Sequence, residues 1–376
     1  MSSAAPAQVT APRAPRPAAS AASSAASSAA SAALEAPFEV LLAPADALRR
    51  RMFLLLGPWA ASWARRREVR VAVFGSMAVI TSFLGAALLP LWMLALGPIV
   101  LGVPHLLGDV RYLWVRPGLH RRALCWAALG VPLLLGMLTT RVSWGLLGAA
   151  GALLVARTTW RRRLLGLAVV APLGILAVMY KGWAEILFAH LHNVIGVSLW
   201  WAWRPREGRA HWLPVALFAG ASVALLLGAA SPLLAWGGGL HSRGTGSSMA
   251  YHLGSLAPHV PRELGLRLVL LFAFAQSVHY AVWLRLIPEE DRPRPAPRTF
   301  LGTFRALRDD FGVVPLYVVA ALALGLAVWA CMDLAAARYG YLRFAGFHGQ
   351  LELAAGALLW AEGYFSAARA RATRGA

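Results

Sequence analysis

The strongest constraint in this sequence is a series of apolar runs, each close to the roughly 20 residues that a helix needs to cross a bilayer. We count ten, near residues 70–92, 96–115, 123–140, 142–157, 163–180, 183–203, 211–236, 264–287, 312–335 and 344–367. Only 14% of the 376 residues are charged, whereas a soluble domain carries about 25%. The runs therefore predict an all-α, polytopic membrane protein with about ten transmembrane helices.

The basic residues are distributed unevenly between the two sides of this predicted bundle. Of the 36 Lys and Arg residues, 28 fall in the N-terminal region, the C-terminal tail and alternate loops, and 7 fall on the opposite side. Because Lys and Arg accumulate in cytoplasmic loops, both termini are expected in the cytoplasm. The same rule accounts for the net charge of +20 without a nucleic-acid partner. The Arg- and Ala-rich composition is typical of a GC-rich bacterial genome, so we expect the inner membrane of a bacterium.

The chain divides by composition into four parts. Residues 1–33 are mostly Ala, Ser and Pro and are predicted to form a disordered tail. Residues 34–69 are predicted to form an interfacial helical segment. Residues 70–368 form the transmembrane domain, and residues 369–376 a basic tail.

Two loops of this domain are long. Residues 237–263 contain three consecutive glycines and three histidines, and are interpreted as a lid or a partly buried segment. Within residues 288–311, apolar residues recur at helical spacing, which predicts a helix lying on the membrane surface.

Two histidine–carboxylate pairs lie inside apolar runs, where ionisable residues are costly and so point to function. His105 and Asp109 are four residues apart, as are His348 and Glu352, and this spacing puts each pair on one helical face. Imidazole and carboxylate together are ligands for iron and for other divalent metals. The carboxylates act either as ligands or as partners that orient the imidazoles.

The runs at 183–203 and 264–287 carry the remaining candidates. On a regular helix His190 and His192 point about 200° apart, so one faces the site and the other contacts a neighbouring helix; which one is left open. His279 is a further candidate ligand, and the candidate catalytic residues are Tyr280 and Glu185.

The depth of these residues along their runs is consistent with one elongated site for one or two metal ions. His105, His190 and Glu352 are expected at about the same depth, Asp109 about a turn below them and His348 about a turn above. His279 is expected deeper. A lone histidine inside a membrane most often makes a hydrogen bond between helices, but four such runs favour a metal site.

The segment Gly102-Val103-Pro104-His105-Leu106-Leu107-Gly108-Asp109 resembles the Gly-x-Pro-His-Gly-x-x-Asp signature of the Brp/Blh family of membrane proteins, with Leu106 in place of the second glycine. Proteins of that family are β-carotene-cleaving dioxygenases that make retinal and use iron. By this resemblance His105, His190, His279 and His348 would be iron ligands.

These features lead to an expected function. We expect a non-heme iron oxygenase in the membrane, with O₂ and a lipophilic small molecule as substrates, such as a carotenoid or another isoprenoid or lipid. Membrane lipids would surround it. The alternatives are a b-type haem redox protein, a transporter that uses the histidines and acidic residues as a proton relay, and a membrane scaffold without catalytic activity.

Overall fold

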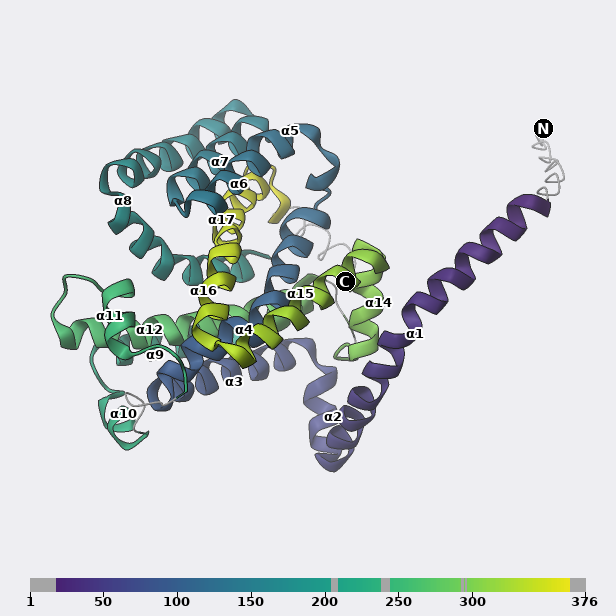
Figure 1. The fold of residues 1–376 in the computed structure, drawn as a ribbon, viewed down its shortest axis with the longest axis horizontal. Coiled ribbons are helices and arrows are strands. Elements are labelled where there is room, and N and C mark those ends of the chain that lie inside the picture. Colours follow the sequence, from purple (N-terminus) through teal and green to yellow (C-terminus); the bar gives the residue numbers. More distant parts are fainter. Residues whose placement is uncertain (1–17, 204–208, 238–243, 292–293, 295, 366–376) are drawn as a thin grey trace, which may run out of the picture. The chain divides into compact units, whose positions relative to one another are not determined.

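The computed structural model describes residues 18–203, 209–237, 244–291, 294 and 296–365, which are helical or lie in turns and loops, with no strand among them. The chain forms two compact units (Figure 1). The first consists of the residues up to Met52 together with Arg298–Leu316. The second consists of Phe53–Pro297 and the residues from Tyr317 onward.

The first unit contains most of α1 (Ala18–Leu55) and all of α14 (Phe300–Phe311). Helix α1 begins directly after Pro17, so residues 18–33 are helical where the sequence predicted disorder. The reason is that the prolines of this region all precede Ala18, and the remaining Ala-rich stretch has the highest helix propensity. Residues 1–17 of the predicted tail lie outside the described residues.

Helix α14 is the amphipathic helix predicted within residues 288–311. Its first turn is capped by Thr299, whose hydroxyl accepts the N–H of Gly302, and by Asp46 of α1, whose carboxylate accepts the N–H groups of Phe300 and Leu301. These bonds satisfy N–H groups that have no partner within the helix. Phe304 then stacks on Phe38 of α1, with ring centroids 4.6 Å apart.

The second unit contains the other helices. They are α2 (Gly57–Arg65), α3 (Arg67–Leu88), α4 (Pro90–Asp109), α5 (Ala123–Cys125), α6 (Val131–Thr139), α7 (Val142–Val155), α8 (Trp160–Trp203), α9 (Trp212–Leu226), α10 (Ser231–Gly237), α11 (Met249–Leu256), α12 (Arg262–Ala281), α13 (Ile287–Asp291), most of α15 (Val313–Met332), α16 (Leu334–Ala345) and α17 (Phe347–Ala361). Short π-helical segments, η1 (Val110–Val115), η3 (Trp126–Gly130) and η5 (Val282–Leu286), and 3₁₀ turns, η2 (Leu119–Arg121) and η4 (Arg209–His211), connect them.

Within the described residues, six helical stretches are long and apolar enough to cross a membrane: Arg67–Leu88, Pro90–Val115, Trp160–Trp203, Arg209–Leu226, Arg262–Asp291 and Val313–Met332. The sequence predicted about ten. The counts differ partly because α8 covers two of the predicted runs, joined at Lys181, where the backbone leaves the helical conformation. The stretches Ala123–Thr139 and Val142–Val155 are apolar but shorter, and α17 has 15 residues.

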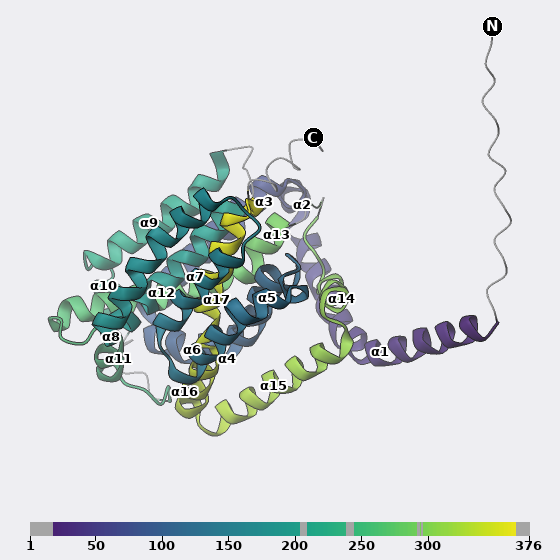
Figure 2. The same ribbon diagram turned by 90° about the horizontal axis from the view of Figure 1, so that it is seen from above.

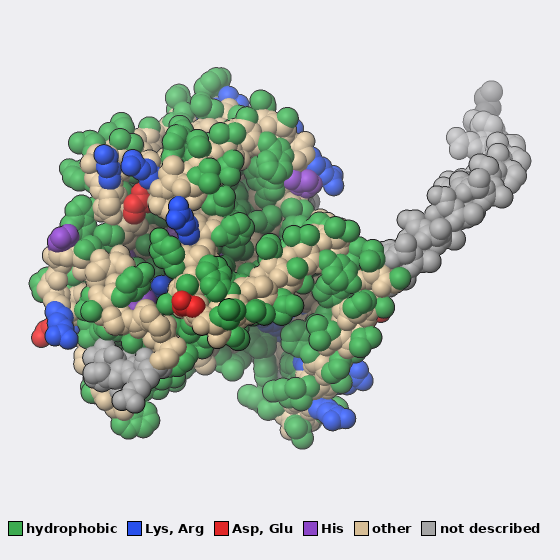
Figure 3. Space-filling view, viewed as in Figure 1, with side chains coloured by type: hydrophobic (Ala, Val, Ile, Leu, Met, Phe, Trp, Pro, Cys, Tyr) green, Lys and Arg blue, Asp and Glu red, His purple; other side chains and the backbone are tan. Residues whose placement is uncertain are grey.

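Helices α12 and α17 provide the core of the second unit. Helix α12 packs against α3, α4, α8 and α9, and α17 packs against α4, α6, α7 and α8 (Figure 2). The outward faces are apolar: hydrophobic side chains cover most of the face in Figure 3, and the basic residues gather in a few places. This pattern is that of a helical bundle in lipid.

A buried ion pair joins α3 to α13. Arg70 and Glu289 are almost completely buried, and the Arg70 Nη2 donates to the Glu289 carboxylate at 2.8 Å. Arg285 also contacts this carboxylate at 2.7 Å, but its side chain is 30% exposed. Because charges buried without a partner are strongly unfavourable, the Arg70 contact is expected to matter more.

We therefore predict that Arg70→Met lowers the free energy of unfolding by about 3 kcal/mol, because Glu289 loses its buried partner. The matched variant Arg285→Met, which removes a partly exposed contact with the same carboxylate, is expected to change stability by about 1 kcal/mol or less. Thermal unfolding in a neutral detergent measures both. Equal effects of the two substitutions would contradict this account.

Candidate metal centre

Four histidines from four helices meet in the interior of the second unit. His105 lies on α4, His192 on α8, His279 on α12 and His348 on α17. A nitrogen from each of His105, His279 and His348 lies within 4.8 Å of those of the other two. The His192 ring lies 5.2 Å from that of His279 and 5.3 Å from that of His348, measured between centroids. The cluster brings together residues as far apart in sequence as positions 105 and 348.

Backbone carbonyls fix the orientation of three of these imidazoles. Each Nδ1 lies close to the carbonyl oxygen three residues earlier: 2.9 Å for His105 and Gly102, 2.8 Å for His192 and Ala189, and 2.5 Å for His348 and Ala345. Because a carbonyl oxygen only accepts, Nδ1 must carry the proton and Nε2 keeps its lone pair. In metal sites, a histidine ligand usually donates its other ring N–H to a carbonyl or carboxylate, and this bond fixes the orientation of the imidazole.

The two carboxylates lie beside Nε2 atoms of this cluster. The Asp109 carboxylate is 3.4 Å from the His105 Nε2, and the Glu352 carboxylate is 3.2 Å from the His279 Nε2. The indole N–H of Trp283 donates to Glu352 at 2.7 Å. Asp109 therefore faces the nitrogen that is free to bind a metal, while the orienting position at Nδ1 of His105 is taken by Gly102.

Six of the twelve polar side-chain atoms of the cluster are buried without a hydrogen-bond partner. These are both Asp109 carboxylate oxygens, the second Glu352 oxygen, the His105 Nε2 and both nitrogens of His279. Each such atom costs about 1–3 kcal/mol when it is left unsatisfied. Imidazole and carboxylate groups that converge in this way fit a divalent transition metal by donor type, number and burial.

Helices α4 and α12, which carry His105 and His279, are each followed by a π-helical segment. A π-helical segment, η1, begins directly after Asp109, and another, η5, begins two residues after Tyr280. Such segments are frequent at functional sites because the extra residue re-aims the side chains that follow. On α8, Gly196 leaves room for the His279 ring: a Cβ there would lie 2.5 Å from Nδ1.

The structure places His192, and not His190, at the cluster. The Nε2 of His190 lies 3.0 Å from the carbonyl oxygen of Leu256, and its ring packs on Phe272. His190 therefore contacts the neighbouring helices α11 and α12 and does not face the cluster. This changes the ligand set that the family resemblance implied, because His192 takes the place of His190.

The predicted depths also need correction for His279, whose ring lies only 5.3 Å from that of His105. Helix α4 begins at Pro90, six residues before the run that the sequence indicated. His105 is therefore fifteen residues into its helix, close to the seventeen of His279 in α12. Only Leu89 separates the end of α3 from the start of α4, and it is as apolar as the helices on either side. The hydropathy pattern therefore did not show where α4 begins.

The two candidate catalytic residues have different surroundings. The Tyr280 ring lies 4.8 Å from that of His105 and is buried next to the cluster. Both carboxylate oxygens of Glu185 lie 2.9 Å from the backbone nitrogen of Val142, the first residue of α7. Glu185 therefore accepts a hydrogen bond at the N-terminus of α7, where a negative charge is favourable. It also lines the cavity beside the cluster.

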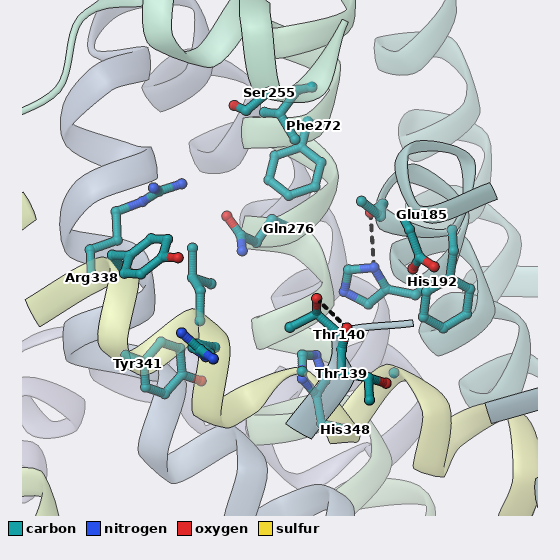
Figure 4. A pocket seen from close by; sticks show the side chains of 18 of the residues that line it. Thr139, Thr140, Glu185, His192, Ser255, Phe272, Gln276, Arg338, Tyr341 and His348 are labelled. Atoms are coloured by element: carbon teal, nitrogen blue, oxygen red, sulfur yellow. Dashed lines mark hydrogen bonds between the residues drawn. The ribbon is translucent and has the colours of Figure 1, made fainter. Parts of the chain in front are cut away.

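A cavity of about 630 Å³ adjoins the cluster. His192 and His348 form part of its wall, and α6, α8, α11, α12 and α16 supply most of the rest. Figure 4 shows Glu185 and His192 on one side, Arg338 and Tyr341 on the other, and Gln276 between them. Its apolar lining includes Leu138, Phe188, Leu256, Phe272 and Leu342.

Sequence reasoning missed three polar groups of this region, Trp283, Arg338 and Tyr341. Arg338 was considered only as one of the basic residues on the less basic side of the bundle, and Trp283 and Tyr341 were not singled out. Burial of Arg338 lowers its pKa, but a guanidinium stays protonated in proteins. No motif spacing marks these residues, because they approach the cluster only through helix packing.

The chain matches no family model, no curated protein and no solved structure.

We predict that Gly196→Ala lowers stability and loosens the cluster, because the added Cβ would meet the His279 ring. Overpacking of this kind costs about 1–3 kcal/mol. Gly220→Ala on α9 is the matched control, since nothing lies within 4 Å of a Cβ at that position; it should be neutral or slightly stabilising. Thermal unfolding in detergent compares them, and an unchanged Gly196→Ala protein would contradict the packing argument.

A second prediction concerns pH. Burial, and secondarily the charge of Arg338, lower the pKa of His252 on α11 to about 4. Between pH 6.5 and 4 the unfolded chain binds a proton at His252 that the folded protein does not, so stability falls as the pH falls. His252 should contribute about 2 kcal/mol of this loss between pH 7 and 5.

The measurement is thermal unfolding at both pH values for wild type and His252→Asn, which cannot titrate. The variant should lose less stability than wild type between pH 7 and 5. An identical pH dependence in the two proteins would show that His252 titrates normally.

Proposed function

We propose that this protein is an integral membrane non-heme iron oxygenase that acts on a lipophilic substrate. The observation that carries the proposal is the cluster of His105, His192, His279 and His348 with Asp109 and Glu352, in which half of the polar side-chain atoms are buried without a hydrogen-bond partner. An ion would provide the charge and the ligand bonds that these atoms lack. A proton shared within the cluster could satisfy only one or two of them.

The residues divide into three roles under this proposal. The Nε2 atoms of His105, His192 and His348 would hold the metal, each with its Nδ1 proton bound to a backbone carbonyl. His279 and the two carboxylates complete a donor set large enough for one or two ions. When bound, Fe(II) supplies open coordination positions and electrons for reaction with O₂.

Tyr280 and the cavity would act on the substrates. The Tyr280 phenol is buried beside His105 and is a hydrogen-bond donor next to the place where oxygen would react. The cavity is large and apolar enough for a long hydrocarbon, and it reaches the cluster at His192 and His348. Its apolar walls would limit the access of water.

The ring distances favour a metal ion over a haem. Five of the six pairs among the four imidazoles have centroid separations of 4.7–6.0 Å. A porphyrin held by two of them would need a plane of free space between facing rings, and the other two rings occupy that region. The same convergence distinguishes the cluster from a proton relay, in which groups follow one another along a path.

The finer parts of the proposal come from the sequence. The motif around His105 resembles that of the Brp/Blh family, which supports an isoprenoid such as a carotenoid as a substrate. The distribution of Lys and Arg supports about ten spans, with both termini in the cytoplasm and the chain in a bacterial inner membrane.

The test is the metal content of detergent-purified protein, measured with its visible spectrum. Wild type is expected to hold one or two irons per chain without a Soret band. His192→Ala should lose most of the iron, whereas His190→Ala, which removes the same side chain two residues away on the same helix, should keep it. Co-purified iron must also support O₂-dependent turnover of a lipophilic alkene.

Three results would overturn the proposal. They are wild-type protein that binds no metal after reconstitution with Fe(II), a Soret band, and equal iron content in the two histidine variants. Circular dichroism and elution volume establish that both variants are folded.

A further inference from the structure

The cavity beside the metal centre contains a buried cation without a described acidic partner. Arg338 on α16 is only 8% exposed and lies in the cavity wall. Its Nε donates to the carbonyl oxygen of Leu94 on α4 at 2.7 Å. In the part of the chain that the structure describes, no carboxylate lies within ion-pair distance of its guanidinium.

The groups next to this guanidinium are neutral and polar. The phenols of Tyr251, on α11, and Tyr280, on α12, line the same cavity and lie close enough to interact with its charge. Gln276 lines the same cavity and is 7% exposed. These side chains can donate hydrogen bonds, but none of them neutralises a positive charge.

An unpaired buried charge costs several kcal/mol, and the bond to Leu94 uses one of the five N–H donors of the guanidinium. Contact with α4 therefore explains the position of the side chain but not its charge. Arginine presents a planar fork of donors that matches the two oxygens of a carboxylate or phosphate. A ligand with such a group would supply the missing negative charge.

The rest of the cavity indicates the kind of molecule that would carry this anionic group. From Arg338 the cavity passes Gln276 and reaches His192 and His348, with Phe188, Phe272 and Leu256 among its apolar walls (Figure 4). A free small anion would leave most of the 630 Å³ empty. A long apolar chain would fill it and could extend toward the metal centre.

We propose that the cavity binds an amphiphile with an apolar chain and an anionic end group, a carboxylate or a phosphate, and that Arg338 binds this end group. The ligand lies with its charged end at Arg338 and part of its chain beside the histidine cluster. This inference names the substrate class of the metal-dependent function proposed above and rests on it. It narrows the substrate from any lipophilic molecule to an acidic one.

The experiment measures binding of radiolabelled hexadecanoate to the full-length protein in a neutral detergent, with competing ligands. Wild type should bind hexadecanoate or hexadecyl phosphate at least tenfold more tightly than hexadecanol, which has the same chain without the charge. Acetate and inorganic phosphate, which have the charge without the chain, should compete at least a hundredfold less well. This comparison needs no variant, so it does not depend on the folding of one.

Substitutions then assign the preference to one side chain. Arg338→Gln should reduce hexadecanoate binding at least tenfold and leave hexadecanol binding within twofold of wild type. Arg338→Lys should recover part of the preference, because it keeps the charge without the fork. The control is Arg262→Gln, which removes an exposed positive charge at the start of α12 and should behave as wild type.

Equal binding of hexadecanoate and hexadecanol by wild type would overturn the inference, as would an unchanged preference in a folded Arg338→Gln protein. Effective competition by acetate or phosphate would show a site for small anions and would also overturn it. Binding is measured on chelator-treated protein as well, where the preference should persist. Wild-type protein that binds no iron but keeps the preference would contradict only the oxygenase proposal, and wild-type protein that binds iron without the preference would contradict only this inference.

Discussion

The main physical constraint on the second unit is that its interior contains nitrogen and oxygen atoms that no hydrogen bond satisfies. Asp109, Glu352 and His279 lie where neither water nor a protein partner reaches most of their polar atoms. In a low-dielectric interior such atoms are unfavourable unless something neutralises them. A cation bound as proposed above would offset the carboxylate charges and accept imidazole lone pairs, which gives one physical reason for six polar side chains from four helices to converge. It would also link the metal to the packing of α4, α8, α12 and α17.

The helices prepare this site through small details of the backbone. Three imidazoles donate Nδ1–H to carbonyls of their own helices, so their tautomers are set before any ligand arrives. Gly196 removes a side chain where the His279 ring lies, and Gly102 does the same for Tyr341 one turn before His105. Helix α11 and helix α16 add Tyr251 and Arg338 to the lining of the cavity beside the cluster. Under the two proposals made here, the polar groups of the site are distributed between a metal-binding end and an anion-binding end.

Several parts of the site were predictable because they depend on spacing within one helix. A residue and the fourth residue after it share a helical face, so the pairs His105–Asp109 and His348–Glu352 were found without a structure. The choice between His190 and His192 was not predictable from the sequence. Both histidines are compatible with α8, and only the rotation of this helix against α11 and α12 decides which one faces the cluster. Arg338 and Trp283 were missed for a related reason. A basic residue near the end of an apolar run and an interfacial tryptophan have the same sequence pattern whether or not they turn inward.

The sequence by itself determined that the chain is a helical membrane protein and that histidines and carboxylates lie inside its apolar segments. Hydropathy and helical period are local properties, and each segment carries them independently. Only the tertiary structure decided where α4 begins and which imidazoles meet. These depend on the packing of helices distant in sequence, where a shift of one turn, about 5.4 Å, replaces one set of facing side chains by another. The burial of the Arg338 guanidinium was also decided only by the tertiary structure, since the groups around it come from α4, α11 and α12.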